Sequence, residues 1–362
     1  MKGLLHLLER VRPVFDEGGR LRALSPVYEA MENFFFAPAT ATRAAPHVRD
    51  PLDLKRFMSM VIVALVPCIA AGFYFFGLRF AVLIAVSYAA GGAVEVLFAM
   101  VRKEQINEGF LVTGMLFPLI LPPAVPLWMV ALGVAFGVFM GKEVFGGTGR
   151  NLFNPALVGR CFLALAYPKA MSGSWLQPAT DLAGRLFQYV DASNVDALTT
   201  ATPLALAKQG EFVSAAHLVL GSVSGSIGET SALAILAGGI FLLLTRVASS
   251  RVVAGILTSF TLLATLLHHA QPGRFGPAHW HLMAGGLLFG AFFMATDPVT
   301  SPTTRTGKWL YGLLIGAVTV LIRNFTGYVE GVTFAILLGN IVGPIFDEAA
   351  YALHMRRRSL EG

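Results

Sequence analysis

The sequence predicts an all-α integral membrane protein, and three observations support this fold class. Only 13% of the 362 residues are charged and 55% are hydrophobic, whereas about a quarter of a soluble domain is charged. Apolar stretches of about 20 residues, the length that crosses a hydrocarbon core of roughly 30 Å, recur along the chain. Glycine and proline positions repeat in two halves. Together these features predict ten transmembrane helices, arranged as two inverted five-helix repeats with broken helices near the membrane midplane.

The apolar stretches set the domain boundaries. We expect membrane spans near residues 57–78, 80–101, 109–126, 127–145, 152–167, 228–247, 251–270, 280–296, 309–325 and 329–349. The predicted organisation is a cytoplasmic N-terminal segment (1–56), a first repeat (57–167), an outer connecting loop (168–227), a second repeat (228–349) and a basic C-terminal tail (350–362). A connecting loop of about 60 residues is too long to be a simple link, so we expect it to carry function.

The distribution of basic residues predicts the orientation in the membrane. Twenty of the 27 lysines and arginines lie on the side of both termini, and six lie on the opposite side. The positive-inside rule therefore puts both termini in the cytoplasm and the connecting loop in the periplasm. This asymmetry also accounts for the net charge of +6 without a nucleic-acid partner.

The internal repeat has an offset of 176 residues. It relates Gly114, Pro122 and Pro126 to Gly290, Pro298 and Pro302. Because each half has an odd number of spans, the second half must be inverted. Proline interrupts residues 117–123 and 294–298, and the backbone groups that it frees must be buried in protein or line a polar cavity.

The connecting loop ends in a polar motif, Asp196 to Thr202. Thr202 followed by Pro203 is typical of a helix N-cap and first helical position. The segment also resembles the acceptor sequence for FMN attached through a threonine phosphoester, and a helix N-terminus can accept a phosphate as well. The residues of this motif are Asp196, Thr199, Ala201 and the acceptor Thr202, with Thr199 and Thr200 as rival acceptors.

A glycine-rich loop, residues 146–155, lies between the fourth and fifth expected spans. Its glycines allow a close backbone approach, and its polar side chains suit a polar ring system. A tight turn between helices is the alternative interpretation, and no Walker or dinucleotide fingerprint is present. The candidate ligand-binding residues are Gly149, Arg150, Asn151 and Asn154.

Longer motifs identify a family. The chain resembles the NqrB/RnfD family of flavin-bearing membrane subunits in residues 47–50, 53–56, 142–151, 154–157, 166–168, 225–229, 293–299 and 307–309. NqrB is the large membrane subunit of the Na⁺-translocating NADH:quinone oxidoreductase. The resemblance covers essentially the whole chain. One departure is Thr200, where the family usually has glycine.

This resemblance implies a function and its cofactors. It implies covalent FMN on Thr202, noncovalent riboflavin near the glycine-rich loop, and electron transfer to ubiquinone or menaquinone coupled to Na⁺ translocation. By similarity, Gly91 and Gly92 lie near the quinone, and Glu95 and Asp347 are candidates for the Na⁺ path. The implied partners are a flavin transferase and the subunits NqrA, NqrC, NqrD, NqrE and NqrF, in a bacterial inner membrane.

Two alternatives remain open at the level of the sequence. An RnfD-type subunit of a ferredoxin:NAD oxidoreductase also carries FMN on a threonine, and quinone reduction would distinguish the two. An inverted five-plus-five repeat is also similar to urea transporters, but a passive channel has no use for a flavin acceptor motif. The cluster of His268, His269, His279 and His281 contains no carboxylate or thiol, which favours interface histidines over a metal site.

Overall fold

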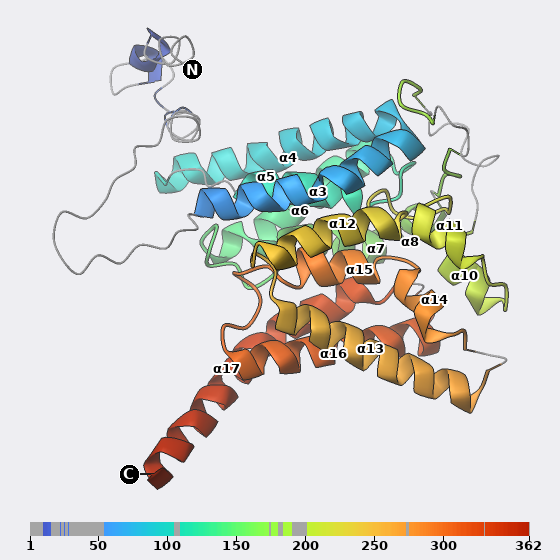
Figure 1. Cartoon of the computed structure of the whole chain (residues 1–362). Coiled ribbons are helices and arrows are strands. Elements are labelled where there is room, and N and C mark those ends of the chain that lie inside the picture. Colours follow the sequence, from blue (N-terminus) through green and yellow to red (C-terminus); the bar gives the residue numbers. More distant parts are fainter. Residues whose placement is uncertain are drawn as a thin grey trace.

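The computed structural model describes residues 10–15, 22, 25, 28, 54–104, 109–173, 175–179, 184–189, 201–272, 275–328 and 330–361. Throughout these ranges the regular elements are helices (Figure 1). Most of the predicted N-terminal segment lies outside them, and so do Asp196, Thr199 and Thr200 of the acceptor motif.

The described helices follow the order of the predicted spans. The first half contains α3 (Leu54–Phe76), α4 (Leu78–Arg102), α5 (Gly109–Leu119), α6 (Leu127–Gly141), η2 (Glu143–Phe145) and α7 (Pro155–Ala166). Short helices α8 (Pro168–Gly173), α10 (Pro203–Lys208) and α11 (Ala215–Leu220) belong to the connecting loop. The second half contains α12 (Ala232–Leu244), α13 (Ser250–Ala270), α14 (Ala278–Met283), α15 (Leu287–Phe289), η4 (Gly290–Met294), α16 (Arg305–Phe325) and α17 (Val332–Glu361).

Six of these helices are long and apolar enough to cross a membrane: α3, α4, α6 with η2, α13, α16 and α17. Helices α5, α7 and α12 are apolar but shorter. The expected span 280–296 is divided among α14, α15 and η4. The chain is therefore helical and membrane-type, whereas the count of ten spans and the inversion of the repeat stay predictions.

Helix contacts follow the same order in the two halves. Helix α4 packs on α6 and α6 on α7, as α13 packs on α16 and α16 on α17. Helix α5 contacts α3, α4 and α7, as η4 contacts α12, α13 and α17. Helices α3 and α12 pack on each other and join the halves. This correspondence is the contact pattern that a structural repeat predicts.

Glycines bring the helix backbones together at the closest crossings. A Cβ atom on Gly159 of α7 would clash with the carbonyl oxygen of Gly133 on α6, and one on Gly312 of α16 would clash with that of Val252 on α13. Small residues at such crossings allow the tight packing that holds helices together in a membrane.

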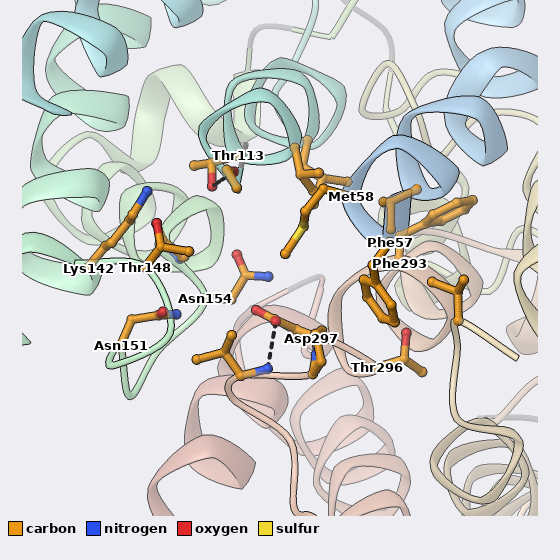
Figure 2. A pocket seen from close by; sticks show the side chains of 18 of the residues that line it. Phe57, Met58, Thr113, Lys142, Thr148, Asn151, Asn154, Phe293, Thr296 and Asp297 are labelled. Atoms are coloured by element: carbon orange, nitrogen blue, oxygen red, sulfur yellow. Dashed lines mark hydrogen bonds between the residues drawn. The ribbon is translucent and has the colours of Figure 1, made fainter. Parts of the chain in front are cut away.

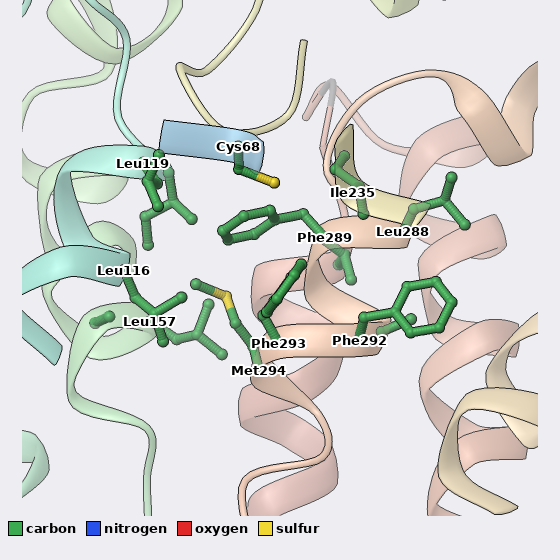
Figure 3. Close-up of a cluster of buried hydrophobic side chains, with 14 of the residues drawn as sticks. Cys68, Leu116, Leu119, Leu157, Ile235, Leu288, Phe289, Phe292, Phe293 and Met294 are labelled. Carbon is green, nitrogen blue, oxygen red and sulfur yellow. The ribbon is translucent and has the colours of Figure 1, made fainter. Parts of the chain in front are cut away.

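Both predicted helix breaks are present. Helix α5 ends at Leu119, and the buried irregular stretch that follows is held by Arg79, whose Nε donates to the carbonyl oxygen of Pro123 (2.8 Å) and whose Nη2 donates to that of Val125 (3.0 Å). The guanidinium thus satisfies carbonyls that no helix satisfies. In the second half the chain forms the π-helical turn η4 and leaves helical structure after Met294. The aromatic side chains of η4 lie in the central apolar cluster (Figure 3).

The elements separate into two ends of the bundle. In Figure 1, α10, α11 and α14 lie at the end opposite the start of α3 and the C-terminal part of α17. We call the first the Thr202 end and the second the terminal end.

Candidate functional site

Thr202 lies at the wall of the large pocket of the Thr202 end. The pocket has a volume of about 560 Å³, within the range of 300–1,000 Å³ typical of small-molecule sites. It is lined by Arg160, Ala164, Pro168, Met171, Ser172, Trp175, Ala201, Thr202, Ala205, Gly327, Tyr328, Glu330, Thr333 and Phe334. We call it the outer pocket.

Thr202 also begins a helix, as its sequence predicts. Its hydroxyl oxygen accepts a hydrogen bond from the backbone N–H of Ala205 at 3.3 Å, and Pro203 is the first residue of α10. Thr202 is 9% exposed. The cap fixes the hydroxyl at the edge of the outer pocket, and Ala201 of the acceptor motif lines the same pocket.

Three aromatic side chains form part of the pocket wall. Trp175 follows α8, whereas Tyr328 and Phe334 flank the start of α17, with their ring centroids 5.2 Å apart. Aromatic faces are the surfaces on which a planar ring system stacks. The sequence did not predict these residues, because they lie about 30 and 130 positions from Thr202 and no local pattern connects them.

A buried charge cluster meets the outer pocket. Arg160 of α7 donates from Nη1 to Glu229 Oε1 at 2.7 Å and from Nη2 to Glu330. Glu330 Oε1 also accepts from the backbone N–H of Gly286 at 3.0 Å. Because Arg160 comes from the first half and both glutamates come from the second, the cluster joins the halves. One guanidinium faces two carboxylates, so this wall of the pocket is polar and hydrogen-bonded.

A second cavity lies where the glycine-rich loop meets the break after η4, and we call it the inner cavity. Its volume is about 70 Å³. Asn151, Asn154 and Asp297 point into the same space (Figure 2). Asn154 Oδ1 caps α7 by accepting from the backbone N–H of Ala156 at 3.0 Å, and Asp297 Oδ1 accepts from that of Val299, also at 3.0 Å.

The inner cavity separates the predicted riboflavin residues. Asn151 and Asn154 are buried in its wall, whereas Gly149 and Arg150 are exposed outside it. Gly149 has φ near 90°, which favours glycine in this turn. A volume of about 70 Å³ has room for a few water molecules but not for a three-ring flavin. The residues present therefore do not enclose a riboflavin.

The predicted quinone and Na⁺ residues already have packing or hydrogen-bond partners. A Cβ on Gly91 would stand 3.1 Å from Val134, and one on Gly92 would stand 3.0 Å from Phe110. These glycines fit α4 against α6 and α5. Glu95 forms a buried ion pair with Lys142, with an Nζ to Oε1 distance of 2.6 Å.

Asp347 of α17 holds the irregular segment that follows η4. Its Oδ2 accepts from the backbone N–H of Thr303 at 2.7 Å, and its Oδ1 accepts from that of Thr304 at 2.9 Å. The hydroxyl groups of both threonines add two further bonds, of 2.9 and 2.5 Å. Glu95 and Asp347 thus lie on different helices with different partners, and their role in Na⁺ passage stays a prediction.

Comparison with known proteins gives full-length relatives. Residues 41–354 match the family described as NQR2, RnfD, RnfE. The NqrB subunit of the Na⁺-translocating NADH-quinone reductase of Klebsiella pneumoniae is 40% identical over 99% of this chain and 100% of the relative. Proteins of the same name from Azotobacter vinelandii and Pseudomonas aeruginosa are also 40% identical, with 97% and 98% of both chains covered.

Proposed function

Because the chain belongs to the NQR2, RnfD, RnfE family, we propose that it carries FMN on Thr202 and passes electrons toward a quinone within a Na⁺-translocating NADH:quinone reductase. Its full-length relatives are named as the NqrB subunit of that oxidoreductase. Those names favour this function over an RnfD-type subunit, and membership of the family argues against a passive channel.

The observation that carries the proposal is the surroundings of Thr202. The hydroxyl lies at the edge of a pocket of about 560 Å³ that contains Trp175, Tyr328 and Phe334. FMN, when bound, would supply reversible oxidation and reduction. Thr202 would hold the phosphate as an ester, the aromatic side chains would hold the rings, and Arg160 with Glu330 would offer the polar groups of the wall.

Helix α7 supports transfer between the two ends of the bundle. Pro155 at its start lines the inner cavity, and Arg160 and Ala164 line the outer pocket. At a rise of about 1.5 Å per residue, roughly 8–14 Å of helix axis separates these positions. The two cavities are thus close neighbours on one rigid element.

At the terminal end we propose the Na⁺ and quinone steps. The carboxylate of Asp297 and the amide oxygens of Asn151 and Asn154 are the oxygen donors that a hard cation prefers. These groups line the inner cavity, whereas Glu95 is paired with Lys142 and Asp347 with the two threonines. We therefore place a Na⁺ step at Asp297 and keep Glu95 and Asp347 as flanking candidates.

The riboflavin proposal needs a surface beyond the inner cavity. The exposed Gly149 and Arg150 are the residues of the loop that a flavin could reach, and a partner subunit would have to cover it there. We also propose that the Thr202 end faces the periplasm and the terminal end the cytoplasm of a bacterial inner membrane, on the basis of the Lys and Arg distribution.

In-gel fluorescence tests the FMN proposal. We expect Thr202→Ala, coexpressed with a flavin transferase, to insert normally and to lose the fluorescent flavin band. Thr202→Ser keeps the hydroxyl and is the matched control, which should retain the band. Thr199→Ala and Thr200→Ala should retain it too. A band that persists in Thr202→Ala and disappears in either of the other two alanine variants would move the acceptor.

A further inference from the structure

A third cavity lies at the Thr202 end, between α10, α14 and the last turn of α16. Its volume is about 220 Å³. It is lined by Leu204, Ala207, Lys208, Phe212, Phe275, Gly276, His281, Arg323, Asn324 and Thr326. Neither Thr202 nor the aromatic residues of the outer pocket line this cavity, so it is a separate space with its own chemistry.

Two buried side chains in its wall have unused hydrogen-bonding atoms. Arg323 is 4% exposed and donates from Nη1 to the carbonyl oxygen of His281 at 2.8 Å. Within the described residues its Nε and Nη2 have no acceptor, and His281 Nδ1 has no partner. A buried guanidinium with unpaired donors is costly. This cost favours a ligand that accepts hydrogen bonds.

The charge of the cavity wall is positive. Lys208 and Arg323 are among its lining residues as the structure describes them, and neither aspartate nor glutamate is. The ammonium of Lys208 donates to the carbonyl oxygens of Thr326 (2.9 Å) and Tyr328 (2.8 Å), which leaves its third N–H for another acceptor.

The nearest glutamates do not fill this need. Gly285 lies against Arg323 Nη2, whereas the next residue, Gly286, lies against Glu229 and Glu330. The carboxylate oxygens of these glutamates accept from Arg160 and from the backbone of Gly286. They balance charge at a distance, but they give no hydrogen bond to Arg323 Nε or Nη2.

We propose that this cavity is a binding site for a phosphate-class oxyanion, held by Arg323 and Lys208 with His281 and Asn324 at its edge. Charge-assisted bonds from guanidinium and ammonium groups are the usual means of phosphate recognition. Leu204, Ala207, Phe212 and Phe275 make the remaining wall apolar. This wall suits either a free phosphate with ordered water or the phosphate of a lipid headgroup.

Binding at this site would stabilise α10. Lys208 is the last residue of α10, and Thr202 caps its other end. An oxyanion bound between Lys208 and Arg323 would therefore link α10 to α16 and fix the position of the Thr202 hydroxyl. The inference does not depend on flavin attachment, because the donors act on any oxyanion.

Thermal unfolding of the purified full-length chain in detergent tests the site. Inorganic phosphate is titrated at constant ionic strength against chloride, and a ligand that binds the folded state raises Tm. We expect a saturable rise in the wild type and in Thr202→Ala. The half-saturating concentration should be about tenfold higher or more in Lys208→Gln and in Arg323→Gln, because each loses a charge-assisted bond. Lys208→Arg should restore binding.

Lys169→Gln is the matched control, since Lys169 is an exposed lysine of α8 that does not line the cavity. A second arm replaces phosphate with short-chain phosphatidylglycerol and compares it with the matching diacylglycerol, which lacks the phosphate. A Lys208-dependent rise with phosphate assigns a free anion, and one with the lipid alone assigns a headgroup. No rise in either arm, or a rise unchanged in Lys208→Gln and equal in Lys169→Gln, overturns the proposal.

Discussion

The outer pocket and the inner cavity share one helix but differ in room and in charge. The outer pocket has a volume of about 560 Å³ and aromatic walls, whereas the inner cavity has about 70 Å³ and is lined by amide and carboxylate groups. Arg160 neutralises acids at the first, and Lys142 turns away from Asp297 to pair with Glu95 at the second. The difference assigns a bulky cofactor to the Thr202 end and a small cation to the break after η4.

The largest expected effect is on the charge cluster of the outer pocket. Arg160→Ala would leave Glu229 and Glu330 buried without their guanidinium, which typically destabilises a protein by about 3–5 kcal/mol. We expect a large fall in Tm of the purified chain. Arg102→Ala removes a more exposed pair with Glu143 and should cost about 1 kcal/mol or less. Equal Tm values for the two variants would show that the Arg160 cluster contributes no special stability.

Helix α7 offers a change that acts on both cavities at once. Gly159→Val would force a side chain against the carbonyl oxygen of Gly133 and should destabilise the bundle by about 1–3 kcal/mol. Gly173→Val is the control, because a Cβ at Gly173 meets no atom within 4 Å. Thermal unfolding measures both variants. A stable Gly159→Val chain would mean that α6 and α7 separate easily.

The Na⁺ proposal is tested by two acidic residues in different environments. We expect Asp297→Asn to raise the Na⁺ concentration for half-maximal quinone reduction about tenfold, as the loss of roughly 1.4 kcal/mol of binding predicts. Asp347→Asn should mainly lower Tm, because Asp347 holds Thr303 and Thr304. The reverse pattern would place the cation at Asp347.

The smallest effect concerns the aromatic wall. Trp175→Leu should leave FMN attached but more accessible to a soluble quencher such as iodide, because a lost ring contact is worth about 0.5–1.5 kcal/mol. Trp309→Leu is a suitable control, since Trp309 is an exposed tryptophan of α16 that does not line the pocket. Identical quenching in both variants would separate Trp175 from the flavin.

Local features were predictable from the sequence. The Thr202 cap, Pro203 as the first helical residue and the breaks near Pro122 and Asp297 follow from rules that act over a few residues, and the structure confirms them. The helical membrane class follows from composition. The predicted span at 280–296 is wrong as a continuous helix, because the chain divides there into α14, α15 and η4.

Tertiary partners were not predictable in the same way. Lys142 lies 47 residues from Glu95, and Glu330 lies 170 residues from Arg160. A single sequence gives no sign of such pairs. Trp175, Tyr328 and Phe334 also reach Thr202 only through the packing of α8 and α17, so the acceptor residue was predicted and most of its pocket was not.

Mass analysis of the peptide that contains Thr202 tests the central claim most directly. The chain would be coexpressed with a flavin transferase, purified from the membrane and digested. We predict a mass increment of one FMN phosphoester on this peptide, with fragment ions that assign it to Thr202. An unmodified peptide, or an increment assigned to Thr199 or Thr200, would contradict the account.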